Sequence, residues 1–82
     1  MLKIYGSMLC PDCVQCCKML SASGISYEFY DFANELLALK TFLSFRDSSP
    51  VFDDVKTNGK IGIPCIVDEN NQVTLEWEQF CM

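Results

Sequence analysis

The stretch "LKIYGSMLCPDC", residues 2–13, decides the fold of this 82-residue chain. Its first letters alternate, are rich in β-forming residues and end in glycine, which predicts a strand over residues 2–5. The pattern becomes helical at Pro11, because proline is favoured at the first position of a helix. The helix is expected over residues 11–23, since Gly24 follows as a stop signal. A strand that leads directly into a helix predicts an α/β fold.

Further elements follow along the chain. "ISYEFYDF" alternates with aromatic residues on both faces, and "ANELLALKTFLSF" has apolar residues at helical spacings. "IPCIV" and "QVTL" flank the turn-forming "DENN", which predicts a β-hairpin. The expected elements are a strand over residues 25–32, a helix over 35–45 capped by Asn34, a connection over 46–62 with one helical turn near 51–55, the hairpin, and one or two final helical turns in "LEWEQF". The order β-α-β-α-β-β-α, with the first two strands parallel, predicts a single α/β domain over residues 1–82.

Charge and composition exclude several classes of function. The chain has 6 basic and 11 acidic side chains and a net charge of −5, which repels nucleic acid and anionic lipid. No apolar run approaches the roughly 20 residues of a membrane-spanning helix, and no signal peptide precedes the first strand. We therefore expect a cytoplasmic monomer without nucleic-acid or membrane partners, whose 6 cysteines are thiols in a reducing compartment.

Cys10 and Cys13 form a CxxC pair at the start of the predicted helix. Cys10 falls at the N-cap, where unpaired backbone N–H groups and the helix dipole stabilise a thiolate, so it is the predicted nucleophile. Cys13 lies one helical turn away on the same side and is the predicted resolving thiol. Pro11 stiffens the turn between them. Structural free cysteines are normally buried, so a pair at a helix start favours redox chemistry over packing.

The other four cysteines have different expected roles. Cys16, three residues after Cys13, lies on the inward stripe of the predicted helix and is expected in the core. Cys17 is expected at the periphery as an oxidisable thiol. Cys65 either approaches the active site or points into the sheet, and Cys81 is expected to be incidental.

The motifs "CPDC", after a strand and at the head of a helix, and "GIPCIV", at the start of a later strand, resemble the glutaredoxin branch of the thioredoxin-fold proteins. The similarity covers nearly the whole chain in element order and length. It implies a thioredoxin-like (glutaredoxin-like) fold with a four-stranded mixed sheet. It also implies a cis-proline at Pro64 that faces the cysteines, with the backbone of Ile63 offered to the glutathione or peptide part of a disulfide substrate. The substrate contacts implied by the resemblance are Pro11, Asp12, Ile63 and Pro64.

The same resemblance implies a thiol–disulfide oxidoreductase, active in cell redox homeostasis and electron transport. Cys10 attacks the disulfide of a protein or of a glutathione mixed disulfide, and Cys13 resolves the intermediate. Glutathione, as a co-substrate, or a protein reductase then reduces the oxidised pair. This cycle needs neither a metal nor an organic cofactor.

Several positions depart from the pattern of that family. Asp12 replaces the usual aromatic residue and opposes ionisation of the neighbouring thiol, and Ser7 replaces a basic residue. "NNQVTLEWE" stands where the family has a Gly-Gly pair and an Asp that hold glutathione, and Glu76 and Glu78 repel an anionic tripeptide wherever they lie near it. These changes predict a more reducing and less glutathione-selective pair than is typical.

Two alternatives stay open. The clustered cysteines could supply thiolates to zinc or to an iron–sulfur cluster, with Cys65 as a further ligand. Against metal binding, zinc sites generally combine two separated knuckles, whereas this chain has one cysteine cluster and no histidine. The third interpretation is a thioredoxin-fold domain that only binds a partner, although such a module has no chemical need for two thiols at this spacing.

Overall fold

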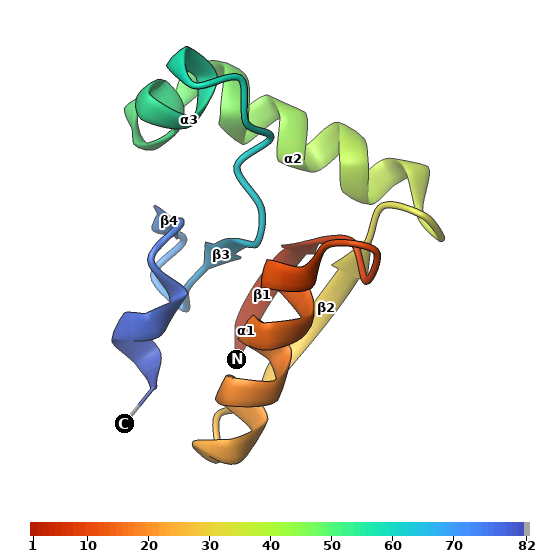
Figure 1. The fold of residues 1–82 in the computed structure, drawn as a ribbon, viewed down its shortest axis with the longest axis vertical. Helices are drawn as coiled ribbons and strands as arrows, with labels where there is room; N and C mark the ends of the chain where they lie inside the picture. The colour runs from red at the N-terminus through yellow and green to blue at the C-terminus, as the bar shows by residue number, and fades with distance from the viewer. Residues whose placement is uncertain (82) are drawn as a thin grey trace.

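A mixed four-stranded sheet lies between two groups of helices in the computed structural model, which describes residues 1–81 (Figure 1). This arrangement confirms the prediction of an α/β protein with a four-stranded mixed sheet. In chain order the elements are β1 (Leu2–Gly6), α1 (Pro11–Ala22), β2 (Tyr27–Asp31), α2 (Leu36–Ser48), the 3₁₀ helix η1 (Pro50–Phe52), α3 (Asp53–Thr57), β3 (Cys65–Val67), β4 (Val73–Thr74) and the 3₁₀ helix η2 (Trp77–Phe80). No helix within the described range is both long enough and apolar enough to cross a membrane.

The strand order in the sheet is β2-β1-β3-β4. β1 pairs in parallel with β2, with Ile4 opposite Phe29, so the first two strands are parallel as predicted. On its other edge β1 pairs antiparallel with β3, with Ile4 opposite Ile66, and β3 pairs antiparallel with β4. β1 is therefore a central strand, and the loop at its carboxyl end leads straight into α1.

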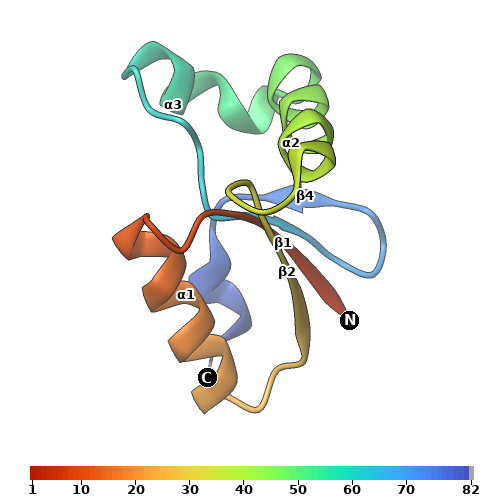
Figure 2. The ribbon, with the colours of Figure 1, turned by 90° about the vertical axis from the view of Figure 1, so that its right-hand side faces the viewer.

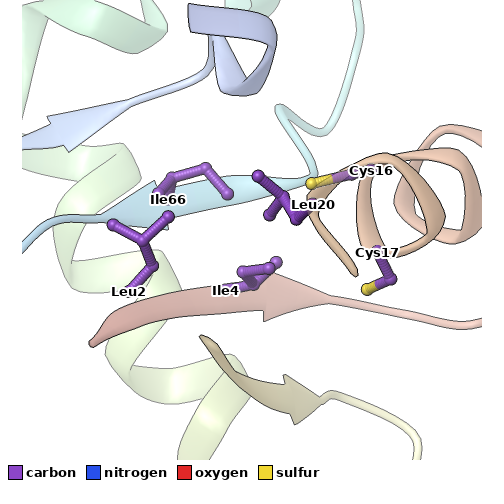
Figure 3. Close-up of a cluster of buried hydrophobic side chains, with 6 residues drawn as sticks. All are labelled: Leu2, Ile4, Cys16, Cys17, Leu20 and Ile66. Carbon is purple, nitrogen blue, oxygen red and sulfur yellow. The ribbon is translucent and has the colours of Figure 1, made fainter. Parts of the chain in front are cut away.

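Figure 2 shows α1 and α2 on opposite sides of the sheet. Successive residues of a strand face opposite sides, so Ile4 contributes to the core under α1 while Tyr5 contributes to the core under α2. We name these two clusters the α1-side core and the α2-side core. The buried residues of the α1-side core are Leu2, Ile4, Cys16, Cys17, Leu20 and Ile66 (Figure 3). Those of the α2-side core are Tyr5, Ala38, Phe42, Phe52, Cys65 and Val67.

The ends of the first helix and of the second strand differ from the predicted ones. α1 ends at Ala22, one residue early, with Ser23 as its C-cap. β2 is shorter than the predicted strand over residues 25–32, because the Ile25 N–H donates to the Leu20 carbonyl at 2.9 Å and closes the helix instead of pairing in the sheet.

The prediction that Asn34 caps the second helix is wrong. Glu35 occupies the N-cap of α2, and no side chain caps this helix end. Asp31 organises the turn instead, since its carboxylate accepts from the Ala33 N–H at 2.9 Å and its carbonyl accepts from the N–H groups of Asn34 and Glu35 at 3.1 and 3.0 Å. Asp31 therefore organises the turn that leads into α2, while the N–H groups of the first helical turn have no side-chain cap.

The segment 46–62 is more helical than predicted, because the helical turn expected near residues 51–55 forms as η1 and α3 and the second helix also extends into the segment. α2 continues to Ser48, and η1 and α3 follow. The Ser49 hydroxyl accepts a hydrogen bond from the Val51 N–H at 3.3 Å, and Pro50 suits the first helical position. Phe52 is fully buried in the α2-side core and fixes this part of the chain against α2.

Candidate active site

Cys10 occupies the N-cap of α1, the position that the sequence predicts for a nucleophilic thiol. Its backbone is extended, with φ −92° and ψ 121°, and its carbonyl accepts the first helical hydrogen bond from the Val14 N–H at 3.1 Å. No side chain caps this helix end, so the backbone N–H groups of the first turn have no side-chain acceptor. The residue is half-buried, and Leu9 before it is 88% exposed.

Cys13 lies one turn further into α1 and is completely buried. Burial raises the pKa of its thiol to about 12, a hydrogen bond with the backbone of Ser7 lowers it, and a hydrogen bond with the Cys10 side chain raises it. Near neutral pH the Cys13 thiol is therefore protonated and can donate to the Cys10 sulfur. The two side chains thus differ in exposure, since Cys10 is half-buried and Cys13 is completely buried.

Gly6 at the end of β1 makes room for the Cys13 sulfur. A Cβ atom at this position would lie 2.7 Å from Cys13 Sγ, which is closer than two such atoms can approach. The glycine that ends the predicted strand thus has a second role that the sequence does not reveal.

A groove of about 420 Å³ opens beside Cys10. Its lining residues come in part from the amino end of α1 and from the segment between α3 and β3, whose course Figures 1 and 2 show. The Ile63–Pro64 peptide bond in this segment is cis, as the resemblance implies. The residues that line the groove are Cys10, Asp12, Val55, Lys60, Ile61, Gly62, Ile63, Pro64, Leu75, Trp77 and Glu78.

The structure brings most of the predicted site residues together. Cys10, Asp12, Ile63 and Pro64 line one groove, and Cys13 is buried behind Cys10. Pro11 is exposed at the start of α1 and is not a groove residue. The substrate contact that the resemblance implies for Pro11 stays a prediction.

Arg46 holds the groove segment in place, and sequence analysis missed it because it fell in the predicted connection. From the last part of α2, its Nε donates to the Ile61 carbonyl and its Nη2 donates to the Lys60 carbonyl, both at 2.8 Å. Gly62 follows with φ +94°, and a Cβ there would lie 2.8 Å from the ring of Phe52. The groove wall thus rests directly on the α2-side core.

Of the other four cysteines, three are buried in the two cores and one is half-buried. Cys16 is completely buried in the α1-side core, as predicted, and Figure 3 shows it beside Leu20. Cys17 was expected at the periphery but is only 7% exposed, because α1 presses this side chain onto the sheet in the same core. Cys65 is completely buried in the α2-side core, which places it in the sheet rather than beside Cys10. Cys81 is half-buried and packs against the α1-side core.

The cysteine cluster does not converge on one point. Cys10 faces the groove, whereas Cys16 and Cys17 belong to the α1-side core. Within residues 1–81, no group of three or more His, Cys, Asp or Glu side chains could hold a metal ion. The arrangement therefore gives no support to the alternative of a cysteine-ligated metal site.

Comparison with known proteins finds a relative in Haemophilus influenzae. The chain is 37% identical over 73 residues to an uncharacterized protein of this organism, covering 89% of this chain and 85% of the relative. The chain belongs to the same family as that protein. No protein-family model and no solved structure matches the present chain.

Proposed function

We propose that this protein is a glutaredoxin-like thiol–disulfide oxidoreductase with Cys10 as nucleophile and Cys13 as resolving thiol. One observation carries the proposal. The half-buried Cys10 lines an open groove, and the completely buried Cys13 lies behind it, one helical turn away. A thiol that only fills space has no reason to lie at a groove with a second thiol behind it.

The fold supports the same proposal. The chain follows a β-α-β-α-β-β order, its first two strands are parallel, and its helices cover both faces of a mixed sheet. These features, together with a CxxC pair at the head of α1, are compatible with a thioredoxin-like topology. A fold alone does not establish an activity, so the proposal depends on the two thiols.

In the first step, the Cys10 thiolate attacks one sulfur of a substrate disulfide. A bond forms between Cys10 Sγ and that sulfur, the substrate S–S bond breaks, and the departing thiolate takes a proton from water. The amino end of α1 favours the attacking anion, because its backbone N–H groups carry partial positive charge. The Cys13 thiol is protonated near neutral pH and lies completely buried behind the attacking sulfur.

In the second step, Cys13 loses its proton and attacks Cys10 Sγ. A Cys10–Cys13 disulfide forms, the mixed disulfide breaks, and the second substrate thiolate leaves. The substrate gains two electrons and two protons, and the protein loses them. Glutathione or a reductase then returns the protein to the dithiol form by the same exchange chemistry.

Titration against a dithiothreitol redox buffer tests the proposal. Trp77, the single tryptophan of the chain, lines the groove with Cys10, so its fluorescence should report formation of the disulfide. We expect one two-electron transition in which the protein loses two free thiols. Cys10→Ser should abolish the transition. Cys13→Ser, treated with the disulfide of 2-mercaptoethanol in place of dithiothreitol, should stall as a mixed disulfide through Cys10, because dithiothreitol would close its own ring and release the protein.

Cys81→Ser is the matched control, because Cys81 lies outside the groove and should leave the transition unchanged. A transition that persists in Cys10→Ser contradicts the proposal. So does stoichiometric zinc or iron in protein purified without oxygen, if that protein shows no two-electron transition.

A further inference from the structure

Two carboxylates line the groove beside the reacting sulfur. Asp12 comes from the first turn of α1, two residues from Cys10, and Glu78 comes from η2. Both side chains are exposed, and within the described part of the chain neither forms an ion pair. Lys60 is the single basic residue that lines the same groove. With two carboxylates and one ammonium group, the charged side chains of the groove lining sum to −1, and neither carboxylate is ion-paired within the described residues.

The rest of the groove is largely apolar. Ile61 is 59% exposed there, and Leu9, directly before Cys10, is 88% exposed. Exposed aliphatic side chains around a reactive group indicate a surface that a partner covers. The other apolar groove residues are Val55, Ile63, Leu75 and Trp77.

The charge of the groove opposes small anionic disulfides. Oxidised glutathione has a net negative charge, and any part of it held near Asp12 and Glu78 is repelled. The chain's net charge of −5 adds a weaker repulsion during approach. A peptide with a basic residue near its cysteine is attracted by the same carboxylates.

We infer that the substrate of this groove is a protein disulfide whose cysteine is flanked by an apolar residue and a basic residue. This inference rests on the proposed thiol–disulfide function and specifies its substrate class. A groove of about 420 Å³ accommodates a few side chains of an extended segment. The basic residue pairs with Asp12 and Glu78, and the apolar residue contacts the aliphatic side chains of the groove.

A series of three matched peptides tests the inference. Each is blocked at both ends, has a leucine beside its single cysteine and differs only in a Lys, Gln or Glu at the next position. Each is linked by a disulfide to uncharged 2-mercaptoethanol. Single-turnover reduction by the wild-type dithiol protein is followed by Trp77 fluorescence and by release of thiol. At low salt we expect the Lys peptide to react about tenfold faster than the Glu peptide, and this ratio to fall below about threefold at 0.5 M salt.

Variants of the groove carboxylates test whether these side chains cause the preference for the Lys peptide. Because Asp12 also lies next to the reacting thiol, rates are divided by that of the Gln peptide before variants are compared. In the double variant Asp12→Asn, Glu78→Gln the Lys-to-Glu ratio should fall to about one. Glu76→Gln removes the same charge two residues from Glu78, at an exposed site that does not line the groove, and should keep the wild-type ratio.

The outcomes separate the two proposals. If the protein reduces none of the peptides, the thiol–disulfide function itself is wrong. If it reduces all three at the same rate, or if the ratio survives in the double variant, the function stands and the inferred substrate class is wrong. Preferential reduction of oxidised glutathione over the Lys peptide also overturns the inference.

Discussion

Gly6 and Cys13 share one small space between β1 and α1. The strand must approach the helix closely here, since the loop between Gly6 and Pro11 is short and the Cys13 sulfur fills the gap. The fit explains why Cys13 is buried while Cys10 stays accessible. Under the proposed function, the second chemical step then depends on Gly6, which has no functional group.

Gly6→Ala should therefore slow resolution. The added methyl group would lie 2.7 Å from Cys13 Sγ, so the thiol must move, and overpacking of this kind costs about 1–3 kcal/mol of stability. We expect attack by Cys10 to persist and the mixed disulfide to accumulate, as measured by mass spectrometry of acid-quenched reactions.

Gly59→Ala is the matched control for Gly6→Ala. Gly59 has φ +68°, so alanine strains it, yet a Cβ there meets no atom within 4 Å. This variant should lose stability without accumulating the mixed disulfide. Equal accumulation in both variants would show that lost stability, and not displacement of Cys13, slows the second step.

The CPDC motif predicts which two thiols form the pair, but it does not predict that one is accessible and the other completely buried. Residues three positions apart lie on the same side of a helix, so the motif places Cys10 and Cys13 together. The complete burial of Cys13 depends on the sheet and on Gly6, which are contributed by tertiary packing. For the same reason Cys17 could not be recognised as a core residue from its helical position alone.

At the scale of elements, α2 supports the active site through Arg46. The two hydrogen bonds from its guanidinium fix the carbonyl groups of Lys60 and Ile61, two residues before the Ile63–Pro64 bond. A planar guanidinium can satisfy two carbonyls at once, which the ammonium of a lysine does less well. α2 thus sets the position of a groove wall without lining the groove.

Arg46→Ala should loosen this wall. Loss of two charge-assisted hydrogen bonds is expected to cost about 1–2 kcal/mol in urea unfolding and to raise amide hydrogen exchange over residues 58–64. Arg46→Lys should recover only part of both effects. Lys40→Ala, on the same helix, removes a charge from an exposed side chain and should change neither. Unaltered exchange over 58–64 in Arg46→Ala contradicts the proposed support.

Element types were easier to predict than their ends. The alternation in β1 and the helical spacing in α2 are properties of the local sequence, and both elements form. The helical turn predicted near residues 51–55 forms as η1 and α3, but the continuation of α2 to Ser48 was not predicted. Phe52 of η1 packs against Phe42 of α2, with ring centroids 5.7 Å apart. Such a contact between distant residues leaves no periodic signal in a single sequence.

Over the whole molecule, three thiols are completely buried, on both faces of the sheet. Burial is the main cause that raises the pKa of Cys13, Cys16 and Cys65 to about 12, from an ordinary value of 9.0. Unfolding lets these thiols ionise near pH 9, so the unfolded chain binds fewer protons than the folded one above that pH. Stability is therefore full below pH 9 and is lost as the pH rises toward 12.

We expect the free energy of unfolding to fall by about 3 kcal/mol between pH 9 and pH 10, about 1 kcal/mol for each thiol. Urea unfolding followed by Trp77 fluorescence, with a phosphine reductant present, measures this loss. Cys65→Ala removes one of the three groups and should reduce the loss to about 2 kcal/mol, whatever its own effect on stability at pH 7. The same loss in Cys65→Ala as in the wild type would exclude Cys65 from the effect.

The six cysteine side chains differ in solvent exposure, and this difference has a practical consequence. Cys10 and Cys81 are partly accessible in the folded protein, whereas Cys16 and Cys65 lie on opposite faces of the sheet and are completely buried. An alkylating reagent thus records which face of the protein opens. Labelling of Cys65 before Cys16 would mean that the α2 layer detaches first, and the reverse order would identify α1. The natural cysteines therefore serve as labelling sites for local unfolding, and no cysteine has to be introduced by mutation.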